Sequence, residues 1–217
     1  MGHSKRNATT IMPGVIPFGA ILAGGHNRRY GAPKALAHVG GERIIDRVVR
    51  ALHGATPDLV LLTNQPELFA GLGLPTRADR RPGLGPLGGL HTALHWAREA
   101  GRPGILAVAG DMPFLSADLL ARMADLAVTD GADVVVPESD NRRGVEPLCA
   151  YYGTRCIEAI EAQLEHDDRR MIGFHDDVHV VRIPQSDVRR FGSLETLFLN
   201  VNTREDRERA QRLAAGA

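Results

Sequence analysis

Short apolar runs alternate with amphipathic helical segments along most of this 217-residue chain. Apolar runs typical of buried strands lie at residues 15–22, 58–63, 104–110, 132–136, 148–152 and 178–183. Helices are predicted between them, at 44–52, 89–100 and 153–164 and after Ser116 and Thr203. Such alternation is typical of parallel strands with helices on both faces of their sheet. The sequence therefore predicts an α/β fold, with a single-domain, three-layer, doubly wound and largely parallel sheet.

Length and composition fit one globular domain. Hydrophobic residues make up 43% of the chain and no linker or repeat interrupts it. We therefore expect a disordered tail over residues 1–12 and one domain over residues 13–217. The opening residues lack the apolar core of a signal peptide, which agrees with a tail.

Charge and cysteine usage exclude several classes of partner. Lys plus Arg and Asp plus Glu number 26 each, so no bulk charge attracts nucleic acid or a membrane surface. No apolar run approaches the roughly 18 residues of a membrane span. Cys149 and Cys156 are the only cysteines and lie among apolar residues, which is typical of a reducing compartment. We expect a cytoplasmic protein with neither nucleic-acid nor membrane partners.

A glycine-rich loop follows the first predicted strand. Gly24 and Gly25 let backbone amides approach a polyphosphate closely, and Arg29 and Lys34 add positive charge beside it. No Gly-Lys-Ser/Thr triplet follows, which excludes a Walker A loop, and Gly31 misses the spacing of the dinucleotide-binding motif. By itself the loop fits a phosphate cradle and a solvated basic turn about equally well.

A carboxylate stands directly after the strand predicted at 104–110. Asp111 would lie at the carboxyl end of a central strand, where open α/β sheets bind their ligands. Its oxygens suit Mg²⁺, which usually bridges one or two carboxylates to substrate phosphates. The alternative is a turn residue that bonds its own backbone. A phosphate loop in the same domain favours the metal ligand.

Two histidine-containing patterns are weaker. His91 and His95 have the i, i+4 spacing of zinc ligands, but Thr92 replaces the glutamate of H-E-x-x-H and no third ligand is evident. We therefore expect them to serve helix packing. The His-Asp-Asp runs at 166–168 and 175–177 are interpreted as solvated acidic turns.

Five short motifs occur in order along residues 20–207. They are L-A-G-G-x-x-x-R-x-G-x-x-K from Leu22, P-L-G-G-L at 86–90, G-D-M-P-F at 110–114, E-P-L-C-A-Y at 146–151 and F-L-N-V-N-T-x-E-D at 198–206. Together they resemble the molybdenum cofactor guanylyltransferases, within the larger nucleotidyltransferase group. Asn27, Tyr30 and Arg204 depart from the family pattern but remove no charge or glycine that the chemistry needs. The resemblance implies a Rossmann-like nucleotidyltransferase fold.

The same resemblance implies an activity. GMP would pass from GTP to the terminal phosphate of molybdopterin, with pyrophosphate leaving and Mg²⁺ as cofactor. Asp111 would hold the metal, and Lys34 and Arg29 would neutralise the pyrophosphate as the other catalytic residues. The N-terminal half would bind GTP and the C-terminal half the acceptor. Proteins that insert the molybdenum cofactor or receive it would be transient partners.

Residues that bind each substrate are implied as well. Those implied for the nucleotide are Leu22, Ala23, Gly24, Gly25, Lys34, Asn64, Asp79, Gly88 and Asp111. For the acceptor, residues 198–203 alternate apolar and polar, so an extended segment would point Asn200 and Asn202 the same way, toward a pterin edge. Asn202 or Thr203 can also cap the last helix.

Two other functions remain open at this stage. One is a transferase with another base or acceptor, such as a cytidylyltransferase for the same pterin or a sugar-1-phosphate nucleotidyltransferase. The other is a nucleotide-binding regulator without turnover. The presence of both Lys34 and Asp111 argues against the regulator.

Overall fold

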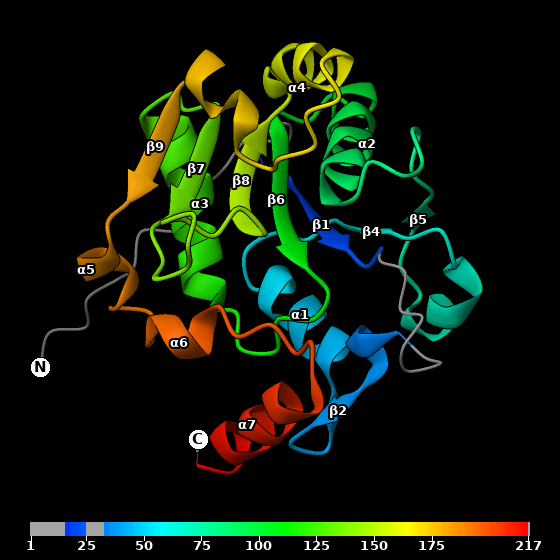
Figure 1. Cartoon of the computed structure of the whole chain (residues 1–217), viewed down its shortest axis with the longest axis vertical. Helices are drawn as coiled ribbons and strands as arrows, with labels where there is room; N and C mark the ends of the chain where they lie inside the picture. Colours follow the sequence, from blue (N-terminus) through cyan, green and yellow to red (C-terminus); the bar gives the residue numbers. More distant parts are fainter. Residues whose placement is uncertain (1–15, 25–32, 217) are drawn as a thin grey trace, which may run out of the picture.

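Seven strands form one central sheet in the computed structural model, which describes residues 16–24 and 33–216. Their order across the sheet is β5-β4-β1-β6-β8-β7-β9 (Figure 1). Their bounds are β1 (Phe18–Leu22), β4 (Leu59–Leu62), β5 (Thr76–Arg77), β6 (Gly104–Ala109), β7 (Val134–Pro137), β8 (Cys149–Gly153) and β9 (Val180–Ile183). A separate hairpin joins β2 (His38–Val39) to β3 (Glu42–Arg43).

The sheet is parallel except for one strand. β1 pairs in parallel with β4 and with β6, and β4 with β5, whereas β8 runs antiparallel to both β6 and β7. Since β7 pairs in parallel with β9, six of the seven strands point the same way. The predicted largely parallel sheet is confirmed.

Helices cover both faces of the sheet (Figure 1). One hydrophobic cluster joins the sheet to α1, α3, α5, α6 and α7, and a second joins the other face to α2 and α4. The bounds are α1 (Ile44–His53), α2 (Pro86–Glu99), α3 (Ala117–Thr129), α4 (Cys156–Glu165), α5 (Gln185–Val188), α6 (Leu194–Leu197) and α7 (Arg204–Ala215). Three short 3-10 helices lie at Lys34–Leu36, Pro66–Leu72 and Gly173–Asp177. The expected three-layer, doubly wound architecture is therefore present.

Strand periodicity explains why one sheet supports two cores. Side chains alternate between the faces of a strand, so Ala20 packs with α2 while its neighbour Ile21 packs with α1. In α1, Ile44, Val48 and Leu52 recur at helical spacing and are fully buried. The apolar pattern of the sequence thus places each helix on its face.

Several predicted boundaries need correction. The second long helix begins at Pro86 instead of residue 89, because Gly85 has φ +62 as its N-cap and proline fits the first helical turn without a free N–H. The helix predicted from residue 153 begins at Cys156, because Gly153 still belongs to β8. The first strand starts at Phe18; residue 15 lies outside the described residues, as does the tail predicted at 1–12.

Two predicted helix caps are confirmed. The Ser116 side chain accepts from the Leu119 N–H at the start of α3, and Thr203 forms a capping box with Asp206 at the start of α7. Cys149 and Cys156 are buried free thiols, as expected. Within residues 16–24 and 33–216, no helix combines the length and the apolar character that crossing a bilayer requires.

Candidate active site

A cavity of about 740 Å³ opens at the carboxyl ends of the parallel strands. Residues at or just after the ends of β1, β4 and β6 line it, among them Leu22, Leu62 and Gly110. The chain leaves β1 for β4 on one side and later returns to β6 on the other, so the strand order reverses at β1. Such a reversal is where open α/β sheets form their ligand crevices.

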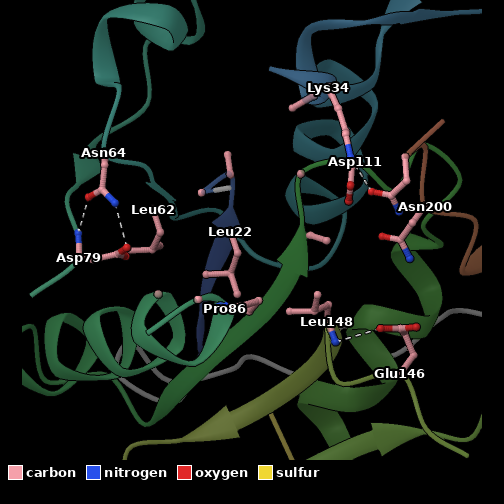
Figure 2. Close-up of a pocket in the computed structure, with 18 of the residues that line it drawn as sticks. Leu22, Lys34, Leu62, Asn64, Asp79, Pro86, Asp111, Glu146, Leu148 and Asn200 are labelled. Carbon is pink, nitrogen blue, oxygen red and sulfur yellow. Dashed lines mark hydrogen bonds between the residues drawn. The ribbon is translucent and has the colours of Figure 1, made fainter. Parts of the chain in front are cut away.

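One end of the cavity holds a paired amide and carboxylate (Figure 2). The side chain of Asn64 donates to Oδ2 of Asp79 at 2.9 Å, and the backbone N–H of Asp79 donates to Oδ1 of Asn64 at 3.0 Å. These reciprocal bonds hold both side chains in place after β4 and β5. The free lone pairs of Asp79 remain acceptors for a ligand.

A glycine-rich turn and the start of α2 form one wall. Gly83 and Gly85 have positive φ values of 87 and 62, which glycine adopts without strain. Gly89 lines the wall, and a Cβ there would lie 3.2 Å from Cδ2 of Leu22. The N-terminal end of α2 therefore faces the cavity, and the positive end of a helix dipole favours anions. Gly88, by contrast, does not line the cavity.

The other end of the cavity brings together residues from distant parts of the chain (Figure 2). Asp111 follows β6, and the backbone N–H of Val201 donates to its carbonyl oxygen at 3.0 Å. Nζ of Lys34 donates to Oδ1 of Asn202 at 2.9 Å, and Asn200 lies beside them on the wall. Lys34 and Asp111, which are predicted to be catalytic, and the predicted acceptor asparagines therefore share one end of the cavity.

The segment before α7 is not a strand. Phe198 is the C-cap residue of α6, and residues 199–203 belong to no helix or strand. Leu199 and Val201 are both buried, which agrees with the prediction that these two apolar side chains point away from the asparagines. Asn200 and Asn202 both reach the cavity.

Asp111 is a desolvated carboxyl group. Burial raises its pKa above the usual range, although its own backbone N–H and the charge of Lys34 act in the opposite direction. The charge of Asp206 raises the pKa further. No other side chain of the described residues forms a hydrogen bond or ion pair with this carboxylate within standard distances, and it lines the cavity. An unpaired oxygen donor of this kind fits a hard dication.

Glu146 is a third carboxyl group on the cavity wall, after Asp79 and Asp111, and no role was predicted for it. Burial raises its pKa, whereas the backbone N–H of Leu148 at 3.2 Å and the amide of Asn141 at 3.2 Å stabilise its charged form. Arg143 lines the wall beside it. The E-P-L-C-A-Y motif at 146–151 was the only signal in the sequence for this residue.

The structure brings most predicted nucleotide residues to this one cavity. Those on its wall are Leu22, Ala23, Gly24, Lys34, Asn64, Asp79 and Asp111. Gly25 and Arg29 lie outside the described residues. The cavity thus has the hydrogen-bonded pair Asn64 and Asp79 at one end and Lys34 with Asp111 at the other.

Several proteins are similar to this chain in sequence, and several solved structures are similar to it in fold. The family model described as "MobA-like NTP transferase domain" matches residues 19–179. A "probable molybdenum cofactor guanylyltransferase" of Pelotomaculum thermopropionicum is 37% identical over 90% of this chain and 92% of its own. The molybdenum cofactor guanylyltransferase of Desulfosudis oleivorans is 34% identical over 89% and 93%.

Solved structures agree. The molybdopterin-guanine dinucleotide biosynthesis protein A of Archaeoglobus fulgidus superposes with a TM-score of 0.76 at 25% identity, covering 92% of this chain and 100% of its own. A nucleotidyl transferase of Methanothermobacter thermautotroptrophicus has a TM-score of 0.69 at 21% identity, covering 93% and 98%, which supports the fold.

Proposed function

This chain belongs to the MobA-like molybdenum cofactor guanylyltransferases, and from that membership we propose that it transfers GMP from GTP to the phosphate of molybdopterin. The chain is a nucleotidyltransferase. The observation that carries the finer proposal is the polarity of the cavity, with Asn64 and Asp79 at one end and Lys34 and Asp111 at the other. A nucleoside triphosphate bound along it would place its base and its phosphates in different chemical surroundings.

The proposed reaction is a displacement at phosphorus. A terminal phosphate oxygen of molybdopterin forms a bond to the α-phosphorus of GTP, the bond from that phosphorus to the bridging oxygen breaks, and pyrophosphate leaves. A phosphate nucleophile is already ionised near neutral pH, so the protein needs no general base. Its task is to position two anions and to neutralise their charge.

Asp79 is proposed to read guanine. The pairing edge of guanine offers two adjacent donors, N1–H and the N2 amino group, and a carboxylate can accept both. Cytosine and adenine each present an acceptor on that edge, which a carboxylate would repel. Because Asn64 fixes the Asp79 side chain, the carboxylate that accepts these hydrogen bonds is already oriented before the nucleotide binds.

Lys34 and Asp111 are proposed to act at the phosphates. Asp111 would hold Mg²⁺, and the ion when bound would supply positive charge against the α-phosphate. Lys34 is held by Asn202, so its ammonium group is directed toward the same end of the cavity as Asp111. Arg29 is proposed as the second cation for pyrophosphate from the sequence alone.

Asn200 and Asn202 are proposed to face the acceptor. They offer amide donors and acceptors, which complement the mixed pattern of a pterin edge. The acceptor would then approach from the side of α6, opposite the Asn64–Asp79 end. Cytoplasmic location and brief contact with proteins that insert or receive the cofactor complete the proposal.

A panel of nucleotides tests the assignment. Purified protein with Mg²⁺ and molybdopterin is incubated separately with GTP, CTP, ATP and UTP, and the dinucleotide and pyrophosphate are quantified. Product is expected with GTP above all, and Asp79→Asn should reduce that preference while leaving the fold intact. A clear preference for CTP would assign the chain to the cytidylyltransferases instead. Pyrophosphate release in the absence of molybdopterin would contradict the assignment of molybdopterin as the acceptor substrate.

A further inference from the structure

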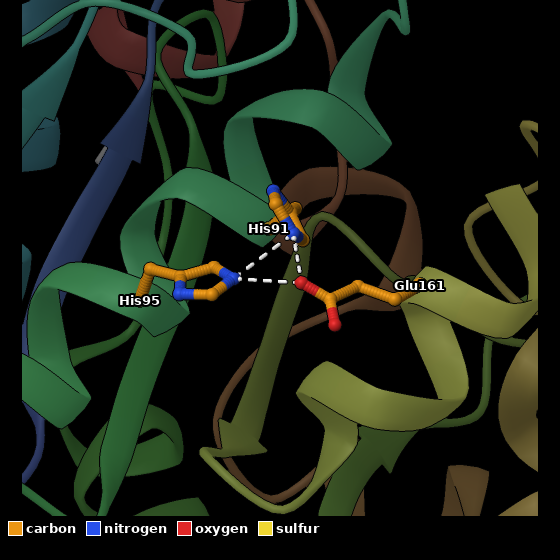
Figure 3. A group of neighbouring side chains, drawn as sticks. All are labelled: His91, His95 and Glu161. Atoms are coloured by element: carbon orange, nitrogen blue, oxygen red, sulfur yellow. Dashed lines mark hydrogen bonds and ion pairs between the residues drawn. The ribbon is translucent and has the colours of Figure 1, made fainter.

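Three side chains converge on the face of α2 that packs against α4 (Figure 3). Nε2 of His91, Nε2 of His95 and Oε1 of Glu161 lie 3.0 Å from one another in each of the three pairs. None of the three lines the cavity described above. The sequence shows no third ligand, whereas the fold brings Glu161 to the two histidines; it lies 66 residues after His95, too far for any local motif to reveal it.

Protons alone cannot satisfy this triangle. A neutral imidazole carries one proton, so each Nε2 is either a donor or an acceptor. If both Nε2 atoms donate to Glu161, two donors face each other at 3.0 Å. If one histidine donates to the other, the accepting nitrogen and the carboxylate oxygen face each other with lone pairs only. At least one of the three contacts is thus unfavourable in each neutral arrangement.

A cation satisfies all three atoms at once. Two imidazole nitrogens and one carboxylate oxygen form a donor set that zinc uses with water in its open position. Ligand atoms about 2.0–2.2 Å from a tetrahedral zinc lie about 3.2–3.5 Å apart, so the 3.0 Å separations need only a small expansion. We propose that His91, His95 and Glu161 form a binding site for a divalent transition metal of the zinc class.

The protonation states suit a metal. Burial lowers the pKa of His91 and so favours the neutral imidazole, whose single ring proton can lie on Nδ1 and leave Nε2 to the metal. Hydrogen bonds from His91 and His95 lower the pKa of Glu161, which keeps the carboxylate charged. No proton therefore has to be removed from the carboxylate or from an imidazolium ion of His91 before the ion enters.

Burial separates a fixed part of the site from an accessible part. The side chains of His91 and His95 are 5% and 12% exposed, whereas that of Glu161 is 44% exposed. Nδ1 of His91 is buried without a partner among the described residues, so the Nε2 contacts orient this ring. An ion can enter from the Glu161 side and find both imidazoles already positioned.

One neighbour must move when the metal binds. Nη2 of Arg98 lies 3.3 Å from Nδ1 of His95, and metal binding through Nε2 puts the ring proton on that Nδ1. Arg98 also donates to Glu158 at 3.0 Å, so it can release His95 and keep an ion pair. This shift costs little because both partners are exposed.

A metal ion at this site would link two helices. His91 and His95 belong to α2 and Glu161 to α4, so the metal would cross-link these helices across their packed face. The first turn of α2 also forms a wall of the cavity through Pro86 and Gly89. Thr92 stands where a metalloprotease has its general base, so a structural role fits better than hydrolysis.

Metal binding by the full, tag-free chain tests the proposal. Zn²⁺, and Co²⁺ as its spectroscopic substitute, are titrated in excess Mg²⁺, which fills sites that prefer oxygen ligands. The expected result is one ion per chain, visible cobalt absorption and a higher Tm with zinc. Glu161→Gln and His95→Gln should each weaken zinc binding by about a hundredfold or more, since even partners outside the ligand shell contribute 10–100-fold.

A matched variant separates the site from general charge effects. Glu165→Gln removes an exposed carboxylate from the same helix, α4, and should leave zinc affinity unchanged. Should His95→Gln fail to fold, Glu161→Gln still decides, because it is isosteric and half-exposed. Equal zinc affinities for Glu161→Gln and Glu165→Gln, or no stoichiometric binding by the unmodified chain, would overturn the proposal.

Discussion

At the scale of single residues, the account depends most on Asp111. Its carboxylate reaches the cavity from the end of β6 and is desolvated there, with no paired side chain among residues 16–24 and 33–216. Asp111→Asn keeps the size and removes the charge, so turnover should fall on the order of 10²–10³-fold, as for the loss of one transition-state contact. Rates at saturating Mg²⁺ are the measurement. A variant with near-normal turnover and a normal Tm would show that Asp111 is not the metal ligand.

His175 makes the fold sensitive to acid. Burial, with help from the charge of Arg182, lowers its pKa from 6.5 to about 4, although Asp176 opposes the shift. The unfolded chain therefore binds this proton first as the pH falls, and stability declines between about pH 6.5 and pH 4, by roughly 3 kcal/mol at most.

Denaturant unfolding across that pH range measures the effect. His175→Gln cannot titrate, so its stability should decline less steeply than that of the natural chain, whatever its value at neutral pH. Parallel declines would mean that His175 is protonated equally easily in both states.

Single residues also show which parts of the site could be predicted from the sequence and which could not. Asp111 and Lys34 could be predicted because each belongs to a short motif of neighbouring residues in the sequence. Glu161 could not be assigned, because its partners His91 and His95 are close to it only in the fold. Glu146 bonds to its sequence neighbours Asn141 and Leu148, but its position on the cavity wall depends on the fold. A pattern along the chain contains no such information.

At the scale of elements, the turn before α2 and the start of that helix shape one wall of the cavity. Gly85 is the N-cap with φ +62 and ψ −149, a conformation that L residues rarely adopt. Gly85→Ala should therefore destabilise the fold by about 1–3 kcal/mol and weaken GTP binding. Gly71→Ala is the matched control, since that glycine has open space around it and no positive φ. Equal effects of the two variants would show that the turn at Gly85 is not required.

The segment before α7 gives a second prediction at this scale. Asn200 reaches the cavity without a bond to Lys34, whereas Asn202 holds that lysine. Asn200→Ala should therefore lower activity at limiting molybdopterin and leave GTP affinity unchanged, and Asn202→Ala should affect both. Kinetics and a GTP titration separate the two. Loss of GTP binding in Asn200→Ala would place this segment on the nucleotide side.

Elements were easier to predict than their ends and partners. The apolar runs gave each long strand and helix, but the start of α2 depends on Gly85 and Pro86 instead of the apolar period. The apolar pattern also does not show that β8 runs antiparallel, since its pairing with β6 and β7 depends on residues far apart in the sequence. Residues 198–203 alternate like a strand but have no strand beside them, so packing of Leu199 and Val201 alone explains the pattern.

At the scale of the whole molecule, two layers of helices hold one sheet whose strand order reverses at β1. That reversal opens the cavity, and the segments that line it begin at Leu22 and end at Asn202. Residues from both halves of the chain therefore meet at Asp111, which agrees with a reaction that joins two substrates. The expected division into a nucleotide half and an acceptor half follows the cavity only in part, since Lys34 bonds to Asn202.

Tracing the α-phosphorus of GTP distinguishes nucleotidyl transfer from other reactions of the triphosphate. GTP labelled either at the α- or at the γ-phosphate is incubated with the protein, Mg²⁺ and molybdopterin, and the products are separated. The account predicts that the α label appears in the pterin dinucleotide and the γ label in pyrophosphate, in equal amounts. Transfer of the γ label to the pterin, or pyrophosphate without a labelled dinucleotide, would contradict it.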